Sequence, residues 1–383
     1  MKSQKTRSSL IRKDGNQTLL ASLLCVIGGL LIGFLVLVAI NPSGAWSSMV
    51  NMMKNFLVYP SALRMKYFGQ TMVRTAPLLM CALSILFAYK VGMFNIGAAG
   101  QYVAGACAAL YVALGFQMPW YICILAAIAA GALLGAISGA LRTYCNVNVV
   151  ISGIMLNWIA LYLTNLILTA VKHPNSPYTK TLNSVNQSAL IPNAGLGSFF
   201  GNEKAVTIAI PLAIVCAIIV WIVLNKTKFG FELKATGFNL NAAKYCGMKE
   251  NRNIILTMVI AGGLAGMGAA LYYLTGIEDW ETTITSVPAM GFNGIAVAFL
   301  GGLSPIGSIV SAFLIQHITS GGGNVDLTVY SSQVSSLISS LIIYLCAFVA
   351  FFKFFIQTRI RRGDERRAAL AEASKPEEGG AKK

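Results

Sequence analysis

Long hydrophobic runs without charged residues follow one another along most of the chain, and short polar segments separate them. A helix that spans a membrane needs about 20 consecutive apolar residues, and residues 19–40 meet that length without a charge. Ten segments of this character are predicted: 19–40, 71–89, 95–116, 120–141, 149–171, 205–224, 254–276, 289–303, 306–320 and 334–355. The pattern predicts an all-α polytopic membrane protein with about ten transmembrane helices, in a transmembrane domain that covers residues 19–355.

The eighth and ninth segments differ from the others because they are short and only Ser304 and Pro305 separate them. This favours a hairpin that does not cross the membrane fully. With ten spans, the first five and the last five run in opposite senses, which is the arrangement of an inverted repeat. The two halves share no convincing sequence identity, so a five-plus-five repeat is predicted from the topology alone.

The low content of charged residues is typical of a membrane protein, and the distribution of lysine and arginine predicts which side of the membrane each loop faces. Only 11% of the residues are charged, against roughly 25% in soluble domains. Lysine and arginine are in excess in residues 1–18, in the loop 226–252 and in the tail 356–383, so the positive-inside rule makes both termini and this loop cytoplasmic. The net charge of +16 is therefore a topology signal, and membrane lipid rather than nucleic acid is the expected surrounding.

Two segments on the opposite side are longer than tight loops. Residues 41–70 mix Trp46 and Phe56 with lysine and arginine, which predicts an amphipathic stretch at the membrane interface. Residues 172–204 contain three prolines among Asn and Ser, which predicts an ordered but irregular loop. On the cytoplasmic side, the charged tail after Arg359 is expected to be frayed.

Several kinds of chemistry leave no signature in the chain. No G-x-x-x-x-G-K-[ST], H-E-x-x-H or G-x-S-x-G motif occurs, so no cofactor, no metal and no phosphate-loop ATP site is predicted in this chain. The eight cysteines form no C-x-x-C pair. No Asp or Glu lies within the ten predicted spans, whereas ion-coupled carriers place ionisable groups at membrane depth. A membrane-embedded enzyme is also disfavoured, because no catalytic constellation is present.

Neutral polar side chains at membrane depth are the remaining candidates for a functional site. They gather in "VGMFNIGAAGQ", "NVNVVISGIMLNWIALYL" and "GFNG", and the candidates are Phe94, Asn95, Gln101, Asn148, Asn157, Trp158 and Asn293. Amide and aromatic groups suit a neutral polyhydroxylated or heterocyclic solute, because they offer donors and acceptors without a charge to desolvate. Alternatively, each amide forms a hydrogen bond between packed helices, and the two interpretations are left open.

The loop 226–252 is the one sizeable cytoplasmic connection between predicted spans. In "TGFNLNAAKYCGMKEN", Asn239 or Asn241 can cap a short helix that runs to Tyr245, and Gly247 can end it. A surface loop that closes a helix pair and a docking surface for a partner are equally compatible with this pattern.

Four segments occur in the order found in a known family: "VGMFNIGAAGQ", "VVISGIMLNWIALYL", "ATGFNLNAAKYCGM" followed by "AGGLAGMGAALYYL", and "GFNGIAVAFLGGLSPIG". They resemble the permease subunits of bacterial ABC importers of the ribose and branched-chain amino acid permease class, in its nucleoside-type branch. The resemblance covers residues 71–355 and implies a translocation subunit of the bacterial cell membrane. Its solute would be small and neutral, a nucleoside or a simple sugar.

The resemblance also implies partners and roles. The partners are an ATPase chain that binds ATP-Mg, a second and different permease, and an extracytoplasmic solute-binding lipoprotein. The resemblance places the ATPase contact in the loop 226–252, at Gly237, Asn239, Asn241, Ala242, Ala243, Tyr245 and Gly247. The main rival is a secondary carrier or channel that works alone.

The chain departs from the family pattern at two places. Ala99 stands where the family usually has Glu, and Val149 and Gly153 stand at the usual Glu and Thr positions. Both usual carboxylates are therefore missing together.

Overall fold

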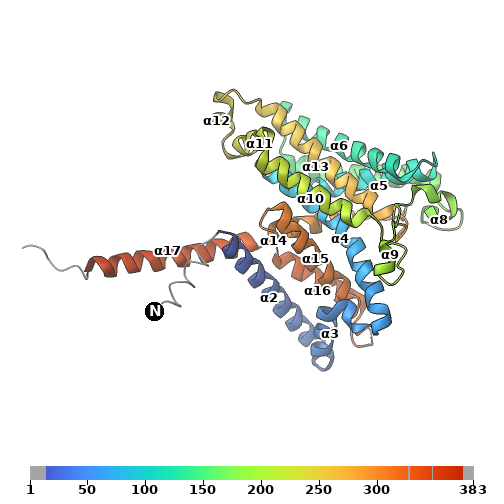
Figure 1. Cartoon of the computed structure of the whole chain (residues 1–383), viewed down its shortest axis with the longest axis horizontal. Helices are drawn as coiled ribbons and strands as arrows, with labels where there is room; N and C mark the ends of the chain where they lie inside the picture. Colours follow the sequence, from blue (N-terminus) through green and yellow to red (C-terminus); the bar gives the residue numbers. More distant parts are fainter. Residues whose placement is uncertain (1–13, 327, 347, 374–383) are drawn as a thin grey trace, which may run out of the picture.

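The computed structural model describes residues 14–326, 328–346 and 348–373 and shows an almost entirely helical chain (Figure 1). Within these residues the extended pairings are isolated bridges, between Lys172 and Thr179 and between Tyr178 and Glu281. The longer helices are α2 (Asp14–Ile40), α3 (Pro42–Lys54), α4 (Ser61–Tyr89), α5 (Ala98–Leu114), α6 (Trp120–Tyr144), α7 (Val149–Leu168), α10 (Ala209–Lys226), α11 (Lys228–Phe238), α13 (Glu250–Tyr273), α14 (Ala289–Leu300), α15 (Pro305–Gly322), α16 (Ser332–Cys346) and α17 (Val349–Ala373). The short ones are η1 (Asn55–Val58), η2 (Thr169–Val171), α8 (Leu182–Val185), η3 (Gln187–Ala189), α9 (Leu196–Phe199) and α12 (Leu240–Tyr245). The predicted all-α class is confirmed.

Helix α4 lies at the centre of the bundle. Every residue from Thr75 to Ala88 is buried, and α4 packs against α10, α13, α14 and α15. In Figure 1 it runs from the group formed by α10 and α13 to the group formed by α14 and α15. A helix that is covered on all sides can be apolar all round, which accounts for the unbroken run "LLMCALSILFA".

Helices α6 and α13 approach to backbone contact through glycines. A Cβ atom on Gly131 would lie 2.2 Å from the carbonyl oxygen of Gly262, and one on Gly135 would lie 2.1 Å from that of Met258. Small residues four apart let membrane helices approach this closely, where dispersion contacts hold them together. The glycine-rich sequence of α13 therefore serves helix packing.

The prediction of ten spans is not confirmed. Within the described residues, six segments are long and apolar enough to cross a membrane: Leu20–Ile40, Ser61–Tyr89, Trp120–Tyr144, Val149–Val171, Ala209–Lys226 and Glu250–Tyr273. Ala98–Leu114, Ala289–Leu300 and Ser336–Leu345 are shorter apolar helices. Helix α14 has 12 residues, a length of about 18 Å. That is too short for a hydrocarbon core of about 30 Å, in agreement with the expected incomplete hairpin.

The predicted tenth span, 334–355, is not confirmed as a single helix. Among the described residues, α16 is Ser332–Cys346, Phe348 lies in a turn, and α17 begins at Val349 and extends away from the bundle in Figure 1. The hydropathy of this segment is continuous, so hydropathy alone could not locate the turn.

The charged tail is helical rather than frayed as far as Ala373, where α17 ends. Its Ala, Glu and Arg residues have high helix propensity. Arg361 and Glu365 also form an ion pair at i and i+4, with 3.3 Å between Nε and Oε1. The tail segments 1–13 and 374–383 lie outside the described residues.

The two longer segments between spans are both ordered. Asn41 caps α3, whose buried face includes Ala45 and Met52 while Trp46 is 71% exposed. That arrangement is the amphipathic one expected for residues 41–70. The segment 172–204 consists of short helical turns joined by irregular backbone, as its composition predicts.

Candidate functional site

A buried pair of carboxamides lies where the chain enters α5. Asn95 and Gln101 are each 1% exposed. Nδ2 of Asn95 donates one hydrogen bond to Oε1 of Gln101 over 2.8 Å and another to Oγ of Ser84 over 3.3 Å. Because Ser84 belongs to α4, the pair fastens the irregular backbone before α5 onto the central helix.

Asn157 of α7 contacts the same turn from another side. Its Oδ1 accepts a 2.7 Å hydrogen bond from the backbone N–H of Gly100, and its Nδ2 donates to the carbonyl oxygen of Ile96 over 3.1 Å. Gly100 lies in the first turn of α5, where backbone N–H groups have no partner inside the helix. Asn157 therefore caps α5 from a neighbouring helix. A Cβ on Gly100 would lie 2.7 Å from Oδ1 of Asn157, so only glycine leaves room for this contact.

The other predicted pathway residues lie in different surroundings. Asn148 is exposed and caps α7. Trp158 is 41% exposed, and its ring stacks on that of Tyr162 with 6.1 Å between centroids. Phe94 and Asn293 are half-buried. The buried amides thus have the partners of the packing interpretation, and a solute pathway along any of these residues stays a prediction.

The two departures from the family pattern coincide with close packing around the same turn. A Cβ on Gly153 would lie 2.8 Å from the backbone nitrogen of Gly97, and one on Gly291 would lie 2.4 Å from Cα of Ala99. Val149 is 8% exposed and belongs to an apolar cluster. A carboxylate at position 99 or 149 would be taken out of water, which costs several kcal/mol unless it is paired. Apolar residues at both positions therefore suit this packing.

We expect Asn157→Ala to destabilise the protein, because it leaves the N–H of Gly100 without its acceptor in a buried place. The expected loss is about 1–3 kcal/mol of unfolding free energy, measured by thermal unfolding of the purified protein in detergent. Asn293→Ala is the matched control, since Asn293 is half-buried and no hydrogen bond of its side chain is found within the described residues. Equal unfolding midpoints for the two variants would contradict a capping role for Asn157.

The loop 226–252 contains two helices, α11 and the shorter α12, which only Asn239 separates. Oδ1 of Asn239 accepts a 3.0 Å hydrogen bond from the backbone N–H of Ala242. Gly247 has φ +78°, a left-handed conformation that favours glycine after a helix end. The predicted capped helix is confirmed with Asn239 as its cap, and Asn241 lies exposed within α12.

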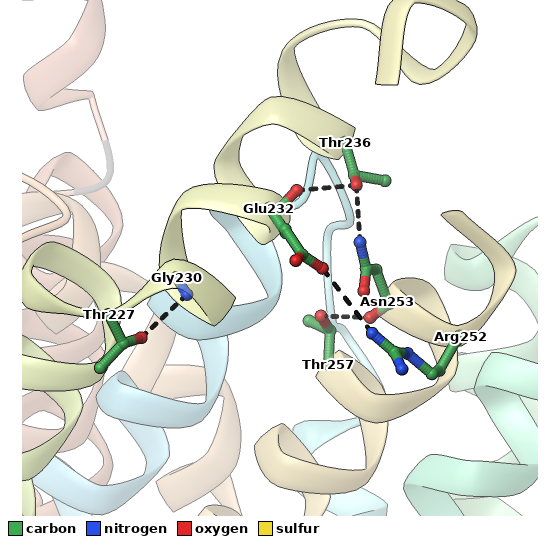
Figure 2. A network of polar contacts seen from close by, with 7 residues as sticks. All are labelled: Thr227, Gly230, Glu232, Thr236, Arg252, Asn253 and Thr257. Atoms are coloured by element: carbon green, nitrogen blue, oxygen red, sulfur yellow. Dashed lines mark hydrogen bonds and ion pairs between the residues drawn. The ribbon is translucent and has the colours of Figure 1, made fainter. Parts of the chain in front are cut away.

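Polar contacts attach this pair of helices to α13 (Figure 2). Arg252 forms an ion pair with Glu232 over 3.7 Å, and Nδ2 of Asn253 donates to Oγ1 of Thr236 over 3.0 Å. A Cβ on Gly237 would lie 2.5 Å from the carbonyl oxygen of Lys90, the residue that follows α4. Because α11 packs on α13 and on the turn that follows α4, a force on α12 reaches both of these parts of the bundle.

Two aromatic side chains project from this rigid unit. Phe238 is 95% exposed and Tyr245 is 93% exposed. The residue before a helix cap commonly packs on the fourth helical residue, which here is the small Ala243, and the ring of Phe238 stays free instead. The sequence predicted Tyr245 as a docking residue and missed Phe238. A large apolar residue before a helix cap, with only an alanine at the fourth helical position to pack on, could have indicated an exposed ring.

Ala243 is 2% exposed and packs within the chain itself. The exposed surface of α12 is therefore formed by other residues of the helix, such as Ala242 and Tyr245. Beside α12 lies a groove of about 440 Å³, which we call the basic groove. Its lining includes Lys228, Phe231, Glu232, Lys249 and Arg252. A fixed short helix with exposed aromatic rings beside the basic groove has the features of a protein-docking surface.

Comparisons with known proteins agree with this architecture. The model of the family described as branched-chain amino acid transport system / permease component matches residues 67–347. The chain is 33% identical over 319 residues to the guanosine ABC transporter permease protein NupP of Bacillus subtilis, which covers 81% of this chain and 87% of that protein. It is 33% identical over 313 residues to the nucleoside ABC transporter permease protein NupB of Lactococcus lactis, with coverages of 79% and 83%. It is 26% identical over 358 residues to the glucose ABC transporter permease protein TsgB13 of Haloferax volcanii, with coverages of 89% and 91%.

No solved structure matches the chain. The family match nevertheless includes the turn before α5, the capping Asn157, and the whole α11–α12 unit. The chain therefore belongs to the family of branched-chain amino acid transport system permease components.

Proposed function

We propose that this chain is the permease subunit of an ATP-driven importer of nucleosides. The observation that carries the proposal is its 33% identity, over about four-fifths of its length, to two permeases named for guanosine and nucleoside transport. The central helices offer no carboxylate to a cationic solute or a coupling ion, because α4, α10, α14 and α15 contain no Asp or Glu. A simple sugar is the second candidate, since a glucose permease is also related.

Uptake in cells tests the solute. The chain is expressed with its partner genes in a bacterium that lacks its own nucleoside uptake, and entry of radiolabelled guanosine is measured. We expect saturable uptake that unlabelled uridine or adenosine reduces and that a large excess of glucose or ribose leaves unchanged. Competition by the sugars without competition by nucleosides would contradict the nucleoside assignment.

The partners follow from the same proposal. An ATPase chain binds ATP-Mg and docks on α12, with Phe238 and Tyr245 as buried aromatic anchors in its surface. A second, different permease completes the pathway together with the candidate residues Phe94, Trp158 and Asn293. An extracytoplasmic lipoprotein delivers the solute to the opposite face. This arrangement converts ATPase closure into movement of α10 and α13, since α11 and α12 connect them.

The orientation and the repeat belong to this proposal as well. Both termini and α12 are placed in the cytoplasm of a bacterial cell, residues 172–204 outside it, and the two halves of the bundle form an inverted repeat.

We expect a membrane-impermeant maleimide to reach a Ser184→Cys variant in intact cells, because Ser184 is exposed in the segment 172–204. The native Cys246, which is exposed directly after α12, should react only after the inner face is opened. Mass spectrometry of the labelled peptides gives the result. Labelling of Cys246 in intact cells, with protection of the cysteine at position 184, would reverse the topology.

A further inference from the structure

Two cavities meet at the turn between α14 and α15. The first is a groove of about 510 Å³ between α2, α14 and α15, and its lining includes Leu23, Val26, Val310 and Leu314. The second has a volume of about 380 Å³, and its lining includes Lys90, Trp221, Asn225 and Lys234. Gly302 and Ser304 line both cavities. The apolar groove and the cavity that carries two lysines therefore lie next to each other at this turn.

The two lysines of the second cavity lie close together without a matching anion. Lys90 directly follows the end of α4 and Lys234 lies in α11, and both are half-buried. Burial lowers the pKa of Lys90, and the positive charge of Lys234 lowers it further. Nζ of Lys234 donates to Oδ1 of Asn225 over 3.3 Å. Over the part of the chain that the structure describes, no ion pair joins either lysine to a carboxylate.

The N-terminus of α15 opens on the same cavity. Ser304 caps this helix of 18 residues, and both Ser304 and Pro305 line the cavity. The N-terminus of a helix carries partial positive charge. Two lysines and a helix N-terminus therefore give the cavity a positive potential that an anionic group would offset.

We propose that these cavities bind one anionic phospholipid of the membrane leaflet at the α12 face, with its phosphate between Lys90 and Lys234 and an acyl chain in the groove. The groove favours a lipid over a free anion, because an inorganic phosphate would leave its apolar lining empty. Leu23 and Val310 are 56% and 70% exposed, so an acyl chain can enter from the surrounding bilayer.

The lipid would contact α2, the turn between α14 and α15, and the place where α11 lies beside Lys90. Lys90 leads into the turn at Gly92, which has φ +74° and lies against Gly237 of α11. A phosphate between the lysines would offset their mutual repulsion where α11 packs on the turn that follows α4. The lipid would therefore stabilise this contact, and α12 directly follows α11.

Native mass spectrometry of the full chain, delipidated in detergent, tests the proposal with phosphatidylglycerol and phosphatidylcholine of identical acyl chains. We expect a clear preference for phosphatidylglycerol. Lys90→Gln combined with Lys234→Gln should weaken phosphatidylglycerol binding by about 30-fold, since each lysine near an anionic lipid contributes a factor of about five. Phosphatidylcholine binding should not change. Val310→Trp fills the groove and should weaken binding of both lipids.

Two further variants separate the site from general charge effects. Lys228→Gln combined with Lys249→Gln makes the same change of net charge at the basic groove and should keep the preference. Lys90→Arg combined with Lys234→Arg should also keep it, because arginine preserves both positive charges. Unchanged phosphatidylcholine binding by the glutamine variant shows that its loss of preference is not misfolding. Equal binding of the two lipids by the unchanged chain would overturn the proposal. So would a preference that survives in the glutamine variant, or displacement by inorganic phosphate with Val310→Trp binding normally.

Discussion

Replacing Phe238 and Tyr245 together by aspartate is expected to abolish transport while the membrane bundle stays folded. Both rings are almost fully exposed, so their loss removes little packing within the chain. In an interface, a buried aromatic anchor contributes about 2 kcal/mol or more, so losing two weakens association by roughly three orders of magnitude. The measurements are recovery of the ATPase with the tagged chain, ATP-dependent uptake, and the unfolding midpoint.

Tyr144→Asp is the control for this experiment, because Tyr144 is 73% exposed at the end of α6, outside α11 and α12. It should keep both the ATPase and uptake. Ala243→Trp, by contrast, would disturb the packing of α12 on its own chain, so its effect would not report on docking alone. If the double aspartate variant retains the ATPase and transports at the normal rate, α12 is not the docking element.

Gly262→Ala should have a larger effect on folding than any exposed substitution. Its new Cβ atom would lie 2.1 Å from the carbonyl oxygen of Gly131, a backbone atom that can move only if α6 and α13 separate. Overpacking a tight interior costs about 1–3 kcal/mol and more where backbone must shift. We expect low yield in the membrane and a strongly lowered unfolding midpoint in detergent.

Gly28→Ala in α2 gives the matched comparison, since no atom besides its chain neighbours and the backbone of its own helix lies within 4 Å of the position of its Cβ. Alanine has the higher helix propensity, so this variant should be as stable as the parent or slightly more stable. Similar midpoints for the two alanine variants would show that the close α6–α13 crossing is not needed for the fold.

The sequence predicted best where a local rule decides the structure. Apolar length located α2, α6 and α7, and cap chemistry located Asn239 and Gly247 around α12. It predicted worst where tertiary contacts decide. Hydropathy could not tell a complete span from the 12-residue α14, because both are apolar. It also could not reveal the turn at Phe348 between α16 and α17.

The candidate site shows the same division. The residue types around Asn95 marked a place where polar groups occur at membrane depth, and that place proved to be a junction of three helices. Whether an amide there faces a solute or a neighbouring helix depends on which residue of another helix lies opposite it. Ser84, 11 residues before Asn95, and Asn157, 57 residues after Gly100, are such partners. No local pattern contains that information.

Reconstitution into proteoliposomes tests most directly whether this chain is a translocation subunit driven by a separate ATPase. Vesicles are prepared with the chain alone, and with the ATPase, the second permease and the lipoprotein, and radiolabelled guanosine is followed with ATP or a non-hydrolysable analogue at the ATPase face. We predict accumulation only in the complete vesicles with hydrolysable ATP. Guanosine uptake by the chain alone, without ATP, would contradict the proposal and establish a stand-alone carrier or channel.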